Sequence, residues 1–177
     1  MAVDDDSFSS LMASLDPAMV VVTSAMDGER AGCLVGFHAQ SSIDPSHYSV
    51  WLSKANHTYR VVLRSTHLAV HFLTENDRGL AEHFGTQSGD DVDKFTDVDI
   101  SLGEGGVPLL MELPNRFLAE RVALLDDGGD HVCVVTRPIR ADTGGPFRPL
   151  RLCDVDDLTP GHESTERNYP PTERSKE

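Results

Sequence analysis

The chain has 177 residues, 29 of them acidic and 15 basic, so its formal net charge is −14 at pH 7. This charge argues against nucleic acid or an anionic membrane as the main partner, because both would repel an acidic protein. The length suits one domain that buries about two thirds of its unfolded surface without help from a metal or a disulfide. Three cysteines without a C-x-x-C motif predict free thiols in a reducing compartment, with Cys33 as a buried, inert one.

The first predicted element is a short N-terminal helix. Phe8, Leu11, Met12 and Leu15 recur at helical spacing, acidic residues precede them, and Pro17 ends the helix. The first residues contain neither a basic segment nor an apolar one, and no apolar run approaches the roughly 18 residues of a membrane span. We therefore expect a cytoplasmic protein without a membrane partner.

Short strands dominate the rest of the chain. Two β-branched runs flank Asp27-Gly28, and the segments 115–125 and 131–140 flank Asp126–Gly129, so each pair predicts a hairpin. Further strands are expected at 48–53, with Trp51 in the core, and at 67–74. Short helices are expected at 56–65, capped by Asn56 with Tyr59, Val62 and Leu63 on one face, and at 78–85. This pattern favours a mainly β fold, a small antiparallel barrel, over a doubly wound sheet.

The stretch SKANHTYR, residues 53–60, lies in a window without Asp or Glu that extends from 45 to 74. A strand that ends at Ser53 and a helix that starts near Asn56 would gather free backbone N–H groups and the positive end of a helix. Ser53 and Thr58 would add hydroxyls, and Lys54 and His57 would add charge-assisted bonds. The stretch therefore predicts a phosphate cradle; the alternative is an ordinary capped surface helix. The glycines of a Walker or Rossmann loop are missing.

Several parts of the sequence stand in an order that resembles a known family. These parts are Ala31-Gly32, Ser41-Ser42, Asp44-Pro45, Ser53, Thr58, Lys94-Phe95 and Gly129-Asp130-His131. In this order, over residues 8–140, the chain resembles the flavin reductase-like domain, an FMN-binding antiparallel split β-barrel. It departs from the family where two serines and an aromatic residue are usual and Gly36-Phe37-His38-Ala39 stands instead.

The resemblance implies a site and a reaction. It implies that FMN, or alternatively FAD, is bound by Val35, Gly36, Phe37, His38, Ala39, Ser41, Ser53, Lys54, Ala55, Asn56, His57, Thr58, Lys94 and Phe95. It implies that His131 lies beside the ring where the nicotinamide of NAD(P)H arrives and acts in hydride transfer to flavin N5. No metal is expected, because His67 and His71 on one strand lie about 13 Å apart.

The same resemblance implies a role and an assembly. The expected role is an NAD(P)H-dependent flavin reductase that can supply reduced flavin to a partner monooxygenase. The alternatives are an oxidase-like or deazaflavin-using split-barrel flavoprotein and a non-catalytic flavin-binding module. We expect a homodimer with the flavin near the interface, a domain at 1–145 and an extended tail at 146–177. This tail either is solvated or wraps a partner subunit.

Overall fold

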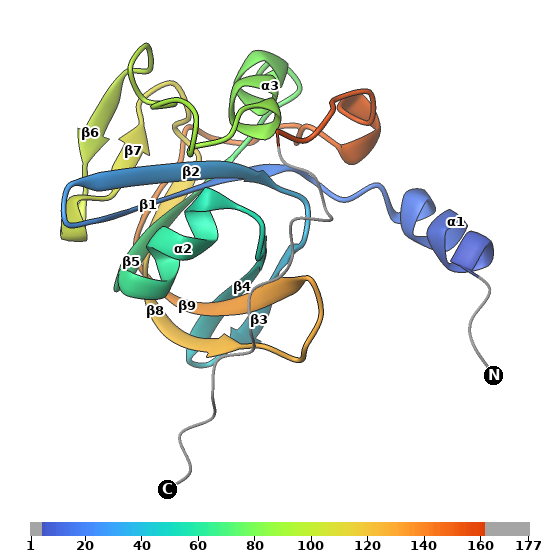
Figure 1. Ribbon diagram of the computed structural model, residues 1–177, viewed down its shortest axis with the longest axis horizontal. Helices are drawn as coiled ribbons and strands as arrows, with labels where there is room; N and C mark the ends of the chain where they lie inside the picture. Colours follow the sequence, from blue (N-terminus) through green and yellow to red (C-terminus); the bar gives the residue numbers. More distant parts are fainter. Residues whose placement is uncertain (1–4, 162–177) are drawn as a thin grey trace, which may run out of the picture.

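A seven-stranded antiparallel sheet forms the body of the molecule in the computed structural model, which describes residues 5–161 (Figure 1). Its strand order is β2-β1-β5-β8-β9-β4-β3. The seven strands, in chain order, are β1 (Val20–Met26), β2 (Glu29–Val35), β3 (His38–Ile43), β4 (Ser46–Ser53), β5 (His67–Phe72), β8 (Arg116–Leu125) and β9 (His131–Asp142). Because β2 and β3 follow each other in the chain but lie at opposite edges of the sheet, the barrel is split between them.

The remaining elements lie around this sheet. They are the helices α1 (Asp5–Leu15), α2 (His57–Arg64) and α3 (Arg78–Thr86), the 3₁₀ turns η1 (Glu104–Gly106) and η2 (Leu152–Asp154), and the hairpin of β6 (Ile100–Leu102) and β7 (Pro108–Leu110). Helix α2 lies between the β1–β2 hairpin and the strands β4, β8 and β9, whereas α3 lies on the other side of β2 (Figure 1). The fold is therefore the predicted antiparallel split barrel with short helices.

Both predicted hairpins are confirmed. Asp27 (φ 52°) and Gly28 (φ 82°) form the two-residue turn between β1 and β2. Positive φ at both positions is the backbone form whose twist matches that of the paired strands. The second hairpin joins β8 to β9 through Asp126–Asp130. There the Asp126 carboxylate accepts the Gly128 N–H at 2.9 Å, which fixes the turn beside the start of α2.

Two apolar cores lie on the two faces of the β1–β2 layer. Val22, Val50, Leu68 and Val134 are fully buried inside the barrel, where α2 contributes Val62. The second core lies between the outer face of β1 and β2 and helix α3, and includes Met19, Val21, Ala81, Phe84, Phe95, Leu150 and Val155. Residues of the predicted tail thus pack against their own chain, while residues 162–177 lie outside the described part.

Four details of the predicted elements need correction. Residues 38–43 form a strand, although their polar sequence predicted none, because β4 supplies the backbone partners. The β6–β7 hairpin was also missed, since each strand has only three residues. Trp51, predicted in the core, is 36% exposed, and Leu63, predicted on the buried helix face, is 38% exposed. The buried face of α2 is instead Thr58, Val61 and Val62.

The N-terminal helix forms as predicted but contacts little of the barrel. Phe8, Leu11 and Leu15 are 54%, 63% and 68% exposed, and α1 stands away from the barrel in Figure 1. Its apolar spacing therefore predicted the helix correctly without predicting what that face packs against.

Candidate functional site

The start of α2 provides the backbone geometry that the sequence predicted. Asn56 has extended backbone angles and precedes the helix without making a side-chain capping bond, and the first turn contains no acidic residue. The first backbone N–H groups of a helix have no partner within the helix, and they carry its partial positive charge. Ser53 is buried at the end of β4, where its hydroxyl accepts the Ala55 N–H at 3.3 Å. The N–H groups of Lys54 and Asn56 bond to the Asp130 and Ser53 carbonyls. The backbone donors left for a ligand are therefore those at the start of α2 itself.

Lys54 ties this turn to the β8–β9 hairpin. Its backbone N–H donates to the Asp130 carbonyl at 2.9 Å, and its Nζ donates to Asp126 Oδ1 at 2.8 Å. The Lys54 ammonium lowers the pKa of Asp126 below its usual value, mainly through this hydrogen bond. Because about a fifth of the Lys54 side chain is exposed, its ammonium can also meet a ligand from solvent.

His131 and Phe37 adjoin this turn. His131 pairs with Ser53 across β9 and β4. The rings of Phe37 and His131 meet edge to face with centroids 5.2 Å apart, and Phe37 is 60% exposed. Phe37 is held in place because its carbonyl accepts the Trp51 N–H at 2.9 Å. The structure thus brings an exposed aromatic ring, a histidine and the predicted phosphate cradle together.

The other predicted residues of the 35–41 segment lie in different surroundings. Val35 is buried, and Ala39 and Ser41 are exposed on β3. The His38 ring is held by two partners: Nε2 lies 2.7 Å from the Ala18 carbonyl and Nδ1 lies 2.6 Å from the Tyr48 hydroxyl. Because the Ala18 carbonyl can only accept, Nε2 carries the proton. Burial lowers the pKa of His38 and raises that of Tyr48 to about 12, so both stay neutral near pH 7. Flavin contact by this segment stays a prediction.

Lys94 and Phe95 are buried beneath β2. Lys94 is 5% exposed. Its ammonium donates to the Gly32 carbonyl at 3.1 Å and to the Phe84 carbonyl at 2.9 Å. Burial lowers the Lys94 pKa. Phe95 packs edge to face on Phe84 at 5.6 Å. These contacts join the loop after α3 to β2, and flavin contact by Lys94 and Phe95 stays a prediction.

Thr58 faces the interior of the barrel. It is 2% exposed, and its side chain hydrogen bonds with the Cys33 thiol. Burial is the larger influence on Cys33 and raises its pKa, so the thiol stays protonated, in line with the inert thiol predicted from sequence. Thr58 can therefore offer its backbone N–H at the helix start more readily than its hydroxyl.

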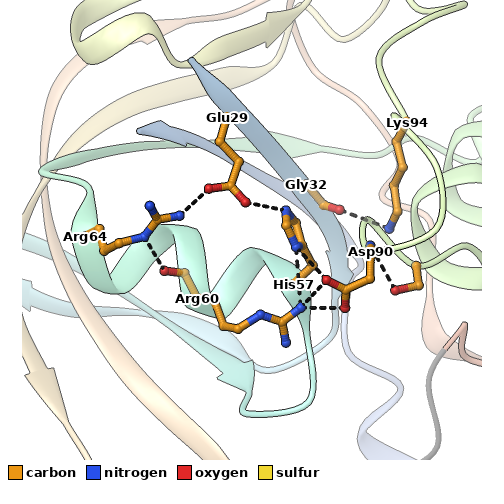
Figure 2. A network of polar contacts seen from close by, with 8 residues as sticks. Glu29, Gly32, His57, Arg60, Arg64, Asp90 and Lys94 are labelled. Atoms are coloured by element: carbon orange, nitrogen blue, oxygen red, sulfur yellow. Dashed lines mark hydrogen bonds and ion pairs between the residues drawn. The ribbon is translucent and has the colours of Figure 1, made fainter. Parts of the chain in front are cut away.

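The basic side chains His57, Arg60 and Arg64 of α2 already have carboxylate partners (Figure 2). Asp90 contacts His57 Nδ1 at 3.0 Å and also pairs with Arg60, and Glu29 contacts His57 Nε2 at 3.3 Å and pairs with Arg64. The hydrogen bond with Arg60 is the main reason why the Asp90 pKa is lowered. Sequence reasoning missed Glu29, Asp90 and Asp126, because all three lie outside the 45–74 window and only the fold brings them back to it.

Neither a metal site nor a membrane-spanning helix is found among the described residues. Within 5–161, no three His, Cys, Asp or Glu side chains lie close enough together to hold a metal ion. His71 is fully buried, with Nδ1 lying 3.2 Å from the Val21 carbonyl and Nε2 accepting the Leu110 N–H at 3.1 Å. None of the described helices has the length and apolar character that a membrane crossing requires.

The fold is an antiparallel split barrel, and the candidate site lies where the helix α2 begins, beside the β8–β9 turn. The sequence model of the family described as "Flavin reductase like domain" matches residues 12–154. The chain belongs to this family. The match extends across the barrel, the start of α2 and the β8–β9 turn.

The individual relatives have low sequence identity to this chain, but each alignment covers most of both proteins. The chain is 28% identical over 135 residues to the FMN reductase (NADH) SmoA of Agrobacterium fabrum, covering 76% of this chain and 75% of that protein. It is 26% identical to HsaB of Mycobacterium tuberculosis, the reductase subunit of a flavin-dependent monooxygenase, covering 75% and 68%. The solved structure of the NADH:FAD oxidoreductase SgcE6 of Streptomyces globisporus shares the fold, with a TM-score of 0.68, 24% identity and coverage of 85% and 96%.

Proposed function

We propose that this protein is a flavin reductase that binds FMN and reduces it with NAD(P)H. The observation that carries the proposal is the family match over 12–154, which includes every residue of the candidate site. Relatives named as an FMN reductase and as a monooxygenase reductase subunit support the same reaction class.

The residues at the start of α2 suit the phosphate of FMN. Phosphate oxygens accept several hydrogen bonds at once, and a helix N-terminus with an adjacent ammonium offers them. Ser53, Lys54, Ala55, Asn56, His57 and Thr58 are the residues proposed to hold it. Segment 35–41 and Phe37 in particular would lie along the ring, because Phe37 presents an exposed aromatic surface next to the cradle.

His131 is proposed to position the nicotinamide. Its Nδ1 lies 2.8 Å from Asp130 Oδ1, so Nδ1 carries a proton, and in the neutral ring Nε2 is an acceptor. An acceptor at this point can bind the amide of a nicotinamide or hold a proton beside the ring. The bound flavin itself supplies the redox chemistry, which is hydride acceptance at N5. The protein fixes the distance between the two rings and excludes water.

One experiment separates this proposal from the other flavin-binding classes. The purified protein is loaded with FMN, and its absorbance at about 450 nm is followed after anaerobic addition of NADH or NADPH. A reductase bleaches within seconds. A flavoprotein that retains its colour with both nicotinamides is instead a storage module or an enzyme with another reductant. A protein that binds no flavin contradicts the whole proposal.

The physiological setting is proposed on two observations. The relative HsaB is named as the reductase subunit of a monooxygenase, so we infer that this protein passes reduced flavin to a partner monooxygenase. Its three cysteines are free thiols, the state that the reducing cytoplasm maintains, and this supports a cytoplasmic location.

We also propose a homodimer that uses the outer face of β4, β9 and β8. Trp51 pairs with Cys133, and Cys133 pairs with Leu125, so the three side chains form one row across this face. Leu125 is 58% exposed and Trp51 is 36% exposed. His131 lies two residues from Cys133 and therefore on the same face, beside Phe37. A second copy on this apolar row would cover the ring-binding edge of the site.

Light scattering tests the dimer. Leu125→Arg should yield a monomer that binds FMN less tightly, because a charge in an apolar interface is costly and the cover over the ring is lost. Leu102→Arg is the matched control, since Leu102 is 67% exposed on β6, outside this row. A monomeric wild-type protein that still binds FMN tightly would refute the proposal.

A further inference from the structure

The loop between α3 and β6 carries a carboxylate to the start of α2. Asp90 belongs to this loop, 33 residues from His57 in sequence, yet its carboxylate bonds to His57 and to Arg60. These two side chains lie one helical turn apart on α2, which begins at His57. A carboxylate that contacts two basic side chains at a helix start offers a negative charge and acceptor atoms, as a ligand phosphate would there.

The loop is held so that this contact is made without a ligand. Lys94 anchors its far end to the Gly32 and Phe84 carbonyls, and Asp93 pairs with Arg30 at 2.5 Å. At its near end the backbone of Gly89 lies against the His57 ring, where a Cβ would come 2.8 Å from His57 Cδ2. Only glycine permits this approach, so the loop geometry places Asp90 on the cations.

The contact is nevertheless open to displacement. The Asp90 side chain is 51% exposed, Arg60 is 30% exposed and His57 is 15% exposed. Ion pairs at this exposure are weak because water competes for both partners. A phosphate monoester carries a charge of about −1.5 to −2 near pH 7, compared with −1 for a carboxylate. It can therefore replace Asp90 on the same cations.

We propose that Asp90 is an internal competitor for the ligand phosphate and thereby sets how strongly the protein discriminates between phosphorylated and unphosphorylated flavin. This inference rests on the proposed phosphate site at the start of α2. In the free protein Asp90 occupies His57 and Arg60. Binding of a flavin phosphate displaces the carboxylate, and the lost ion pairs lower the affinity for FMN but not that for riboflavin. Asp90 is in this sense a specificity-determining residue that contacts no flavin ring.

Asp90→Asn tests this directly, with Asp91→Asn as the matched control. Asp91 is the next residue of the same loop and makes no ion pair within residues 5–161. Both variants remove one negative charge, but only the first removes the carboxylate that contacts His57 and Arg60. We expect Asp90→Asn to tighten FMN binding by about threefold to tenfold, the range of an exposed charge pair. The affinity of Asp90→Asn for riboflavin should equal that of the wild type. Asp91→Asn should change the ratio of FMN affinity to riboflavin affinity by less than about twofold.

Inorganic phosphate provides a second readout without the ring. It should compete with FMN at lower concentration in Asp90→Asn than in the wild type. The proposal would be overturned if the ratio of FMN affinity to riboflavin affinity were unchanged or smaller in Asp90→Asn while its melting temperature stayed the same. Asp90 would then only connect the loop to the helix.

A measurement on the wild-type protein covers the case in which Asp90→Asn does not fold. Saturating FMN should speed amide hydrogen exchange in residues 88–92, because the carboxylate has left its partners. Slower or unchanged exchange there contradicts displacement. The proposed phosphate site is tested separately: if Lys54→Ala weakens FMN selectively while the Asp90 tests fail, only this inference is lost. If FMN and riboflavin bind the wild type equally and Lys54→Ala changes neither, the phosphate site itself is wrong.

Discussion

Two groups of basic side chains in this molecule have opposite surroundings. Beneath β2, Lys94 is buried and bonds only to main-chain carbonyls, and on β5 of the same sheet His71 is buried between two backbone groups. At the start of α2, Lys54, His57 and Arg60 are partly exposed and bond to carboxylates from other segments. Backbone partners cannot leave without unfolding, whereas carboxylates on loops can yield to a ligand. We therefore expect the first group to maintain the fold and the second to be available for function.

The largest expected effect is the loss of the Lys94 ammonium. Lys94→Met keeps most of the volume but leaves the buried Gly32 and Phe84 carbonyls without a donor. We expect the free energy of unfolding in urea to fall by about 2–4 kcal/mol, with little change in FMN affinity of the protein that remains folded. A stable variant with weakened FMN binding would place Lys94 in the second group, as the resemblance to the family implies.

The pH dependence of stability tests whether His71, the other buried basic residue, is neutral in the folded protein. Burial lowers the pKa of His71 from 6.5 to about 3, so the native ring is neutral while the unfolded ring gains a proton as pH falls. Its contribution to stability is complete above about pH 6.5 and is lost progressively as the pH falls toward 3. Between pH 7 and pH 5 this loss is about 2 kcal/mol.

The substitution His71→Gln isolates this contribution. The glutamine side chain does not titrate, so the difference in unfolding free energy between pH 7 and pH 5 should shrink by about 2 kcal/mol relative to the wild type. The carboxylates of the chain titrate in both proteins and cancel in this comparison. Equal pH dependence in the two proteins would show that His71 is charged in the native state or is already neutral when unfolded.

Lys54 should show the reverse of Lys94. Lys54→Ala is expected to weaken FMN by about 1–2 kcal/mol, in the lower part of the range for a charge-assisted bond because Asp126 already shares the ammonium. Riboflavin affinity should hold, and the free energy of unfolding should fall by less than about 1 kcal/mol because the ion pair is partly exposed. Titration of both flavins by fluorescence quenching measures the difference. Equal losses for FMN and riboflavin would remove Lys54 from the phosphate site.

The smallest predicted effect concerns His131, which lies on β9 opposite Ser53 and therefore beside the second group. His131→Ala should keep the FMN-bound colour and the melting temperature but lower kcat/KM for NADH by about tenfold, or ~1.4 kcal/mol of transition-state stabilisation. Stopped-flow reduction of the bound flavin separates binding of the nicotinamide from the reduction rate. If neither changes, His131 serves the β8–β9 turn alone.

Local pattern was enough for most of the elements. The β-branched runs and the turn residues Asp27-Gly28 and Asp126–Gly129 predicted the two hairpins, because turns depend on neighbours in sequence. Asn56 predicted where α2 begins, although its side chain makes no capping bond. The order of short motifs indicated the split barrel through its resemblance to a family. The strand 38–43 was not predicted because its residues are polar, and they form a strand only through pairing with β4.

The polar turn formed by Ser53, Lys54 and the start of α2 followed from the sequence alone, since these residues are consecutive. The electrostatic state of that turn did not. The 45–74 window contains no carboxylate, yet Glu29, Asp90 and Asp126 come to its cations from a strand and two loops. Burial of Lys94, exposure of Trp51 and the contact between Phe37 and His131 were likewise decided by the folded sheet. Contacts between residues tens of positions apart depend on how strands and loops meet in space, and no local pattern records that.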